Sequence, residues 1–336
     1  MIISRRLIVH TRLMAPLVAR LSVVAVLVAL GISRLAAQTA APETVVYRLK
    51  STSTFQRGCF APCLCPVMES GSERGTFLLT FTGFDGLYNH YRVDDVSWKI
   101  RTPGGELRAT GSGTYKVGGE FAVQQQLELD LKVGDKPVEH FDSGLVAGGG
   151  EFPRIAITLS VHGQVCFDTV FGVDASPVPL EEILSYRLQQ ESTFQRGCFD
   201  ICDCAIVELP LRGGFSLVPI DKNPLFTEYS VVQVKWQVGP DPATGATSWL
   251  PVTGFGTYRL GGEFATAQEM GLDLRLGAAA PAFFDSGEVP GGNEFPLIAI
   301  QVSHEENSCV KTVLDLHARP VKVHASAAVR AVEPGP

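Results

Sequence analysis

Eight cysteines are the residues whose type and spacing could do chemistry in this chain. Three of them fall within seven residues in the pattern Cys-x-x-x-Cys-x-Cys, a fourth follows about a hundred residues later, and the whole arrangement occurs twice. Sulfur in this arrangement can form disulfides or hold a soft metal ion. The eight positions are Cys59, Cys63, Cys65, Cys166, Cys198, Cys202, Cys204 and Cys309.

Disulfides are the first interpretation, because an even number of cysteines follows a segment typical of export signals. Four cysteines in each half allow three pairings. Cys63 and Cys65 are poor partners, since residues two apart on an extended strand point the same way but lie too far apart. One of the first three should therefore reach the distant cysteine. The predicted pairs are Cys59–Cys63 and Cys65–Cys166 in the first half, and Cys198–Cys202 and Cys204–Cys309 in the second.

A thiolate metal site is the alternative use of the same eight cysteines. Three sulfurs and a distant fourth could surround zinc, or copper(I) through soft sulfur. The spacing contains no standard Cys-x-x-Cys pair, and no histidine holds the same place in both halves: His162 aligns with Glu305, and His304 with Val161. We therefore predict no cofactor and keep metal binding as the second hypothesis.

An arginine stands two residues before the first cysteine of each cluster, at Arg57 and Arg196. A guanidinium there could lower a thiol pKa and make the cysteine reactive. A thioredoxin-like enzyme would need Cys-x-x-Cys beside an α/β pattern, which the sequence lacks. We therefore expect structural arginines, paired with a carboxylate such as Glu120 or Glu263.

Two short motifs raise a hydrolase hypothesis. Asp142-Ser143-Gly144 and Asp285-Ser286-Gly287 each follow a phenylalanine, once in each half of the chain. In this respect the chain resembles the pepsin-type aspartic proteases, a resemblance that implies two aspartates sharing one proton. It departs from that family in the approach Val138–His140 and in Leu145 and Glu288, which follow the glycines. Because Asp-Ser-Gly is also a common turn sequence, we expect no enzyme and no catalytic residue.

The cysteine clusters and the Asp-Ser-Gly motifs each occur twice because the chain contains an internal duplication. Tyr47-Arg-Leu matches Tyr186-Arg-Leu, and Trp98 matches Trp236. The offset grows from 139 at the first cysteines to 143 further on, which we assign to an inserted Pro/Gly-rich loop at Pro240–Ser248. A period near 140 residues is a domain rather than a solenoid repeat. We predict a signal peptide at 1–41, β domains at 42–179 and 180–321, and a disordered tail at 322–336.

Strand periodicity predicts the elements that position the cysteines. Apolar and polar residues alternate with period two at Phe77–Phe81, Leu127–Val133 and Ile155–Val161, and again in the second half. That period indicates half-buried antiparallel strands. Paired glycines at Gly118-Gly119 and Gly261-Gly262 suit tight hairpin turns. The fold class is all-β: two tandem homologous antiparallel β-sandwich or small barrel domains of about eight strands, with both matched tryptophans in the core.

The N-terminal segment and the net charge of the chain limit the possible cellular locations and binding partners of the protein. Four arginines precede Leu21–Ile32, an uncharged run of 12 residues, and small-residue cleavage sites follow. This order is typical of a secretory signal peptide, and the run is short of the roughly 20 residues that span a bilayer. Removing the leader takes five basic residues and no acid, leaving 23 basic against 35 acidic and a net charge of −12. We predict a periplasmic or extracellular protein that binds no nucleic acid and keeps no membrane span.

These observations predict an exported, disulfide-stabilised, non-catalytic protein that acts by binding or as an envelope component. Nothing in the sequence names its ligand or partner.

Overall fold

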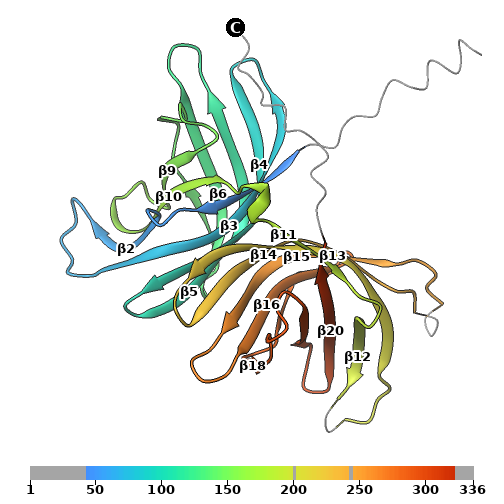
Figure 1. Ribbon diagram of the computed structural model, residues 1–336. Coiled ribbons are helices and arrows are strands. Elements are labelled where there is room, and N and C mark those ends of the chain that lie inside the picture. Colours follow the sequence, from blue (N-terminus) through green and yellow to red (C-terminus); the bar gives the residue numbers. More distant parts are fainter. Residues whose placement is uncertain (1–42, 200–201, 242–244, 322–336) are drawn as a thin grey trace, which may run out of the picture. The chain divides into compact units, whose positions relative to one another are not determined.

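The computed structural model describes residues 43–199, 202–241 and 245–321 of the chain. These residues form twenty strands and one short 3₁₀ helix, η1 (Leu180–Glu182). The predicted signal peptide and tail lie outside the described residues, as does part of the predicted inserted loop. The all-β prediction is confirmed (Figure 1). In the described part of the chain, no helix is both long and apolar enough to cross a membrane.

The strands form two ten-stranded antiparallel sheets, one for each half of the duplication. The first sheet contains β1 (Thr44–Leu49), β2 (Thr54–Phe60), β3 (Met68–Phe84), β4 (Tyr88–Thr102), β5 (Gly105–Gly118), β6 (Gln124–Val133), β7 (Val138–Asp142), β8 (Val146–Ala147), β9 (Ile155–Ser160) and β10 (Cys166–Pro177). The second contains β11 (Leu184–Leu188), β12 (Thr193–Cys198), β13 (Val207–Lys222), β14 (Phe226–Val238), β15 (Leu250–Gly261), β16 (Ala267–Leu276), β17 (Ala282–Asp285), β18 (Val289–Pro290), β19 (Ile298–Glu305) and β20 (Val310–Pro320).

Each sheet closes on itself. In the first sheet the path from β10 runs through β2, β3, β4, β5, β6 and β7 to β9, and β9 pairs with β10 again. β1 shares the position of β2 between β10 and β3, and β8 extends β7 along β6. The second sheet has the same order. Eight strand positions in a closed ring correspond to the small barrel rather than to the sandwich.

Period-two alternation explains which side chains fill each closed sheet. Leu127, Leu129 and Leu131 of β6 are buried, as are their counterparts on β16, and they belong to one apolar cluster in each repeat. The predicted run at Phe77–Phe81 is inward at its start, but Phe81 is 42% exposed. Phe81 lies near the end of β3, where its ring contacts Tyr91 of β4 at the margin of the core.

Both matched tryptophans lie in the cores, as predicted. Trp98 on β4 and Trp236 on β14 are almost fully buried, and each meets a phenylalanine of the neighbouring strand edge-on. Each sits opposite a glycine of positive φ, Gly75 (φ 143°) or Gly213 (φ 134°). A Cβ on either glycine would lie 2.1 or 2.2 Å from a backbone oxygen of the tryptophan strand. Glycine therefore lets the strands approach closely beside the largest core side chains.

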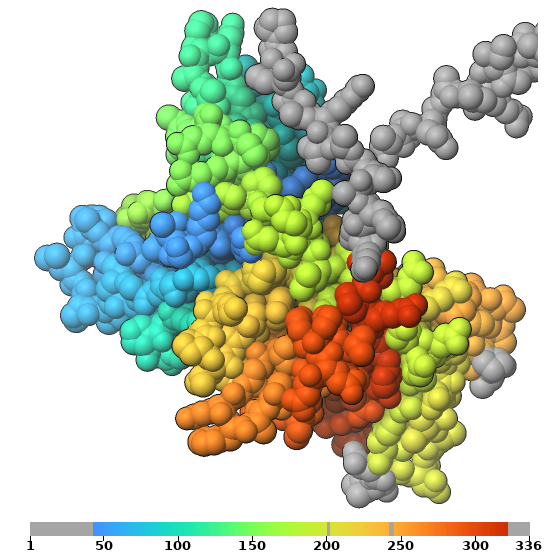
Figure 2. Space-filling view, viewed as in Figure 1, coloured from blue at the N-terminus to red at the C-terminus, as the bar shows by residue number. Residues whose placement is uncertain are grey.

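The predicted hairpins at the paired glycines are present but wider than a two-residue turn. β5 ends at Gly118 and β6 begins at Gln124, and the second repeat repeats this spacing between Gly261 and Ala267. The loops present Phe121 and Phe264, each 96% exposed. The tip of the β5–β6 hairpin stands clear of the neighbouring surface of its sheet (Figure 2, blue-green). The same aromatic residue is thus displayed at the same hairpin in both repeats.

The two sheets belong to one compact unit, and ion pairs join them. The buried carboxylate of Glu228 on β14 accepts hydrogen bonds from Lys99 (3.2 Å) and Arg101 (2.8 Å) on β4. Arg108 on β5 pairs with Asp273 on β16 at 2.7 Å. The pairs are therefore formed by basic side chains of the first repeat and acidic side chains of the second.

A small apolar patch accompanies these ion pairs. Val46 and Leu78 of the first sheet pack in one buried cluster with Val218 and Val232 of the second. Strand register shows that the position equivalent to each of these four residues is polar in the other repeat. The replacements are Ser185 for Val46, Ser216 for Leu78, Thr80 for Val218 and Asp94 for Val232. The two repeats therefore contact each other through faces that are not equivalent. In each repeat, the positions that correspond to the apolar contact residues of the other repeat are polar.

Glu228→Gln should lower the free energy of unfolding by about 1–2 kcal/mol, because a buried acceptor of two charged donors loses its charge. The loss should appear in urea denaturation. Glu208→Gln is the control, since Glu208 is exposed and accepts one bond from Gln195 within its own sheet. Equal midpoints for the two variants would contradict a stabilising role for the ion pairs.

Candidate cystine sites

The backbone around the first cysteine cluster is set by two neighbouring strands. β2 lies antiparallel to β10, with Cys59 opposite Phe167 and Phe60 opposite Cys166. The chain then turns, and the Cys63 amide donates to the Phe60 carbonyl at 3.1 Å. It returns along β2, where the Cys59 amide donates to the Val67 carbonyl at 3.0 Å. The turn carries Cys63 next to Cys166, and the return carries Cys65 next to Cys59.

All eight cysteines lie in pairs at bonding distance, and each pair stays within one repeat. The connectivity differs from the predicted one. A loop closing after four residues would need Cys63 at the return, but the turn places it at β10 instead. The observed pairs, with their Cα separations, are Cys59–Cys65 (5.7 Å), Cys63–Cys166 (4.8 Å), Cys198–Cys204 (5.3 Å) and Cys202–Cys309 (5.5 Å).

The pairing bears directly on the metal hypothesis. A sulfur bonded to another sulfur is not a thiolate, and thiolates are the ligands that zinc or copper(I) would need. Among the described residues, no three His, Cys, Asp or Glu side chains gather in a way that could hold a metal ion. The cystine arrangement is therefore a covalent fastening between β2, its return segment and β10.

A buried carboxylate shapes the loop that precedes Cys166. Asp168 is almost fully buried, and its oxygens accept backbone N–H groups of Val161, His162, Gln164 and Thr169 at 2.7–3.1 Å. A charged acceptor with several backbone donors fixes a loop strongly. The second repeat has lysine at this position and uses Asn307 instead, whose side chain accepts the amides of Cys309 and Val310. Sequence comparison of the halves misses Asp168 for this reason.

Asp168→Asn should lower the free energy of unfolding by about 1–2 kcal/mol, because an amide nitrogen replaces one acceptor oxygen and faces backbone donors. Amide hydrogen exchange should quicken in the 161–166 loop. Asn307→Asp provides the comparison in the second repeat, where an acceptor is kept and little change is expected. An exchange pattern in Asp168→Asn identical to wild type would disprove the role given to this carboxylate.

The two arginines near the clusters have partners other than those predicted. Arg196 makes a two-pronged pair with Glu306 at 2.7 Å, and this pairing lowers the pKa of Glu306 to about 2. Arg57 lies 3.9 Å from Glu69, and its Nε and Nη2 atoms are buried without a hydrogen-bond partner. Glu120 and Glu263 lie at the distant β5–β6 and β15–β16 hairpins. Arg57 stands opposite Glu69 in the β2–β3 pairing, and Arg196 stands opposite Thr312 of β20, whose hydroxyl donates to Glu306.

The surface around the cystines differs between the repeats. In the first, Leu64 is fully exposed, and Val165 and Phe167 are about half exposed. The second repeat has Asp203, Ser308 and Val310 in their places. The first repeat therefore presents a more apolar cystine end than the second.

The Asp-Ser-Gly motifs form bends within their own sheets. Asp142 accepts the Gly144 amide and the Gln126 side chain, while the Ser143 hydroxyl accepts the Leu127 amide and donates to the Gly144 carbonyl. Ser286 makes the same contacts in the second repeat. Within the described residues, no contact joins Asp142 to Asp285. The motifs therefore form bends between β7 and β8 and between β17 and β18. This agrees with the expectation that Asp-Ser-Gly is a turn sequence.

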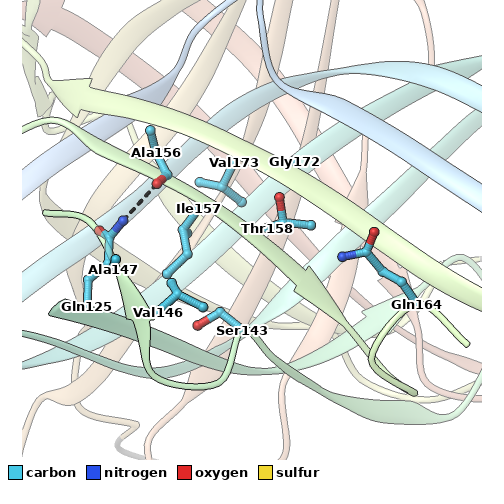
Figure 3. A pocket seen from close by; sticks show the side chains of 10 residues that line it. All are labelled: Gln125, Ser143, Val146, Ala147, Ala156, Ile157, Thr158, Gln164, Gly172 and Val173. Carbon is cyan, nitrogen blue, oxygen red and sulfur yellow. Dashed lines mark hydrogen bonds between the residues drawn. The ribbon is translucent and has the colours of Figure 1, made fainter.

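A seam runs along each closed sheet after this bend. β7 and β9 pair at one position, Asp142 opposite Ser160, and β8 pairs with β6 but not with β9. Gln125 spans the seam: its Oε1 accepts the Tyr115 hydroxyl (3.0 Å), and its Nε2 donates to the Ala156 carbonyl (2.8 Å). Figure 3 shows this amide directed at Ala156, with Val146 and Ser143 nearby.

The second repeat contains the same device. Tyr258 donates to Gln268, which donates to the Ala299 carbonyl at 2.7 Å. In the first repeat a pocket of about 490 Å³ opens along the seam. Its lining mixes polar side chains, such as Thr158 and Gln164, with Val146 and Ile157 (Figure 3). The glutamine bridge was not predicted, although Gln125 and Gln268 occupy matching positions in the sequence.

Comparison with known proteins gives no relative. No family model, no curated protein and no solved structure matches the chain.

Proposed function

We propose that this chain is an exported protein of two disulfide-stabilised β domains that acts by binding, without catalysis, in the periplasm or outside the cell. The observation that carries the proposal is the pairing of all four cysteines within each repeat. Such bonds form and persist in oxidising compartments and are rare where thiols are kept reduced. The basic and apolar leader at 1–41 supplies the route to such a compartment.

Exposed aromatic side chains support a binding role. Phe121 and Phe264 are almost entirely in solvent at equivalent hairpins, where neither contributes to its own core. Exposed aromatic residues on a rigid scaffold are frequent anchors of protein interfaces. The net charge of −12 after leader removal disfavours nucleic acid as the partner, since phosphate binding needs a basic surface.

The test is a thiol, metal and mass analysis of full-length protein expressed with its leader and isolated without reductant. We expect a cleaved leader, no free thiol, no stoichiometric metal, and peptides linking Cys63 to Cys166 and Cys202 to Cys309. A variant lacking residues 2–41 should stay in the cytosol and carry free thiols. Eight free thiols with bound zinc or copper in the exported protein would overturn the proposal.

A further inference from the structure

An isolated carboxyl group lies in the core of the first repeat. Glu73 on β3 is 0% exposed, and neither carboxyl oxygen has a hydrogen-bond partner. It stands opposite Ile100 on β4, and Trp98 is two residues away on that strand. Burying an unpaired carboxylate is costly, so such a group favours its neutral form. Desolvation accordingly raises the pKa of Glu73 well above its ordinary value.

The second repeat shows what the fold requires at this position. Strand register makes Leu211 the equivalent of Glu73, since it stands opposite Val238 as Glu73 stands opposite Ile100. Both amides donate to an equivalent serine carbonyl, that of Ser53 or Ser192. Leu211 is buried in the apolar core of its repeat. The fold is thus satisfied by leucine, and the acid is a feature of the first repeat alone.

No hydrogen bond or ion pair joins Glu73 to a charged side chain of the adjoining strands. Arg57 of β2 has two buried nitrogen atoms without a hydrogen-bond partner, but it does not pair with Glu73, and desolvation alone raises the pKa of Glu73. The other charged side chains have partners of their own: Arg48 pairs with Glu182, Lys50 and Arg154 pair with Asp174 of β10, and Lys99 and Arg101 of β4 pair with Glu106 and Glu228. Asp168 of β10 binds backbone amides, and Arg74 of β3 donates to the backbone carbonyl of Glu73. The buried tyrosines Tyr47 and Tyr115 are neutral below alkaline pH. Ionisation of Glu73 therefore has no local stabilising partner.

We propose that Glu73 couples the opening of the first repeat to loss of a proton, so that this repeat is tightest at mildly acidic pH and loosens as the pH rises. The second repeat, with Leu211, lacks the coupling. A neutral buried acid must leave the core, or admit water, before it can ionise.

The sign follows from proton binding. The unfolded carboxyl ionises near its ordinary pKa of about 4.3, whereas the folded one keeps its proton to higher pH. Between the two pKa values the closed state holds one more proton than the open state, so stability falls as pH rises. The closing equilibrium constant should fall up to tenfold per pH unit in this window. It should level off below the unfolded pKa and above the folded one.

Amide hydrogen exchange by mass spectrometry on the full chain can test this repeat by repeat. Peptides from β3 and β4 report the first repeat, and peptides from β13 and β14 serve as the internal reference. Exchange is compared between wild type and Glu73→Leu at each pH from 4 to 9, which cancels the intrinsic pH dependence of exchange. We expect the ratio of protection, variant over wild type, to rise up to tenfold per pH unit in β3 and β4 and to stay flat in β13 and β14.

Two further variants keep the test decisive. Glu73→Gln cannot ionise but keeps a polar side chain in the core. Its protection in β3 and β4, divided by that of Glu73→Leu, should therefore be the same at every pH. Leu211→Glu should transfer the dependence to β13 and β14. Two results would overturn the proposal: a β3–β4 ratio of Glu73→Leu over wild type that stays flat from pH 4 to 9, or a β3–β4 ratio of Glu73→Gln over Glu73→Leu that changes with pH.

Discussion

Replacing Cys63 and Cys166 together with serine is expected to lower the free energy of unfolding by about 4–5 kcal/mol. The bridge spans a sequence separation of 103, and closing so long a loop removes much conformational freedom from the unfolded chain. The Cys59–Cys65 bridge spans 6, so its removal should cost about 2 kcal/mol in the same chain-entropy model. Urea denaturation of the two double variants measures the difference.

The second repeat offers a matched control, because Cys202–Cys309 has a separation of 107. Its removal should cost as much as that of Cys63–Cys166. Thiol titration tests the connectivity directly, because the Cys59→Ser/Cys65→Ser variant should have no free thiol. Under the pairing first predicted from the sequence, that variant would break two bridges and expose two thiols. Two titratable thiols would thus contradict the observed connectivity.

Much of the fold follows from period-two alternation and the duplication. Apolar residues, mostly leucine, recur at every second position over much of β6 and β16, so these strands can be predicted from the sequence alone. Ring closure is harder, because it depends on β9 pairing with β10 and on a bend between β7 and β8. The alternation is identical in an open sandwich and a closed sheet, so the sequence left both architectures open.

Cysteine connectivity shows where sequence reasoning stops. Spacing correctly separated Cys63 from Cys65 and assigned the distant cysteine to one of the first three. It could not show that the chain bends after Phe60 and brings Cys63 next to β10, because that bend depends on local backbone contacts such as the hydrogen bond from the Cys63 amide to the Phe60 carbonyl. Likewise, Glu73 reads as an ordinary surface acid until register places it opposite Ile100.

Gln125→Met is expected to lower the free energy of unfolding by about 2–4 kcal/mol. Methionine has a similar length, but it leaves the Tyr115 hydroxyl and the Ala156 carbonyl without their buried partner, and each orphaned group costs about 1–3 kcal/mol. The loss should be concentrated at the seam, because β8 and β9 are not paired there and the glutamine bridges the gap. Amide exchange in β9 should therefore accelerate more than exchange in β5 or β6.

The duplicated bridge makes this expectation testable within one molecule. Gln268→Met removes the equivalent link between Tyr258 and Ala299 and should accelerate exchange in β19 while leaving β9 protected. Gln124, next to the bridge, accepts one bond from the partly buried Tyr88, so Gln124→Met should have a much smaller effect. If β9 and β19 kept wild-type exchange in both bridge variants, strand pairing alone would close the two sheets. Gln125 and Gln268 would then be shared by the two repeats without contributing to the closure of either sheet.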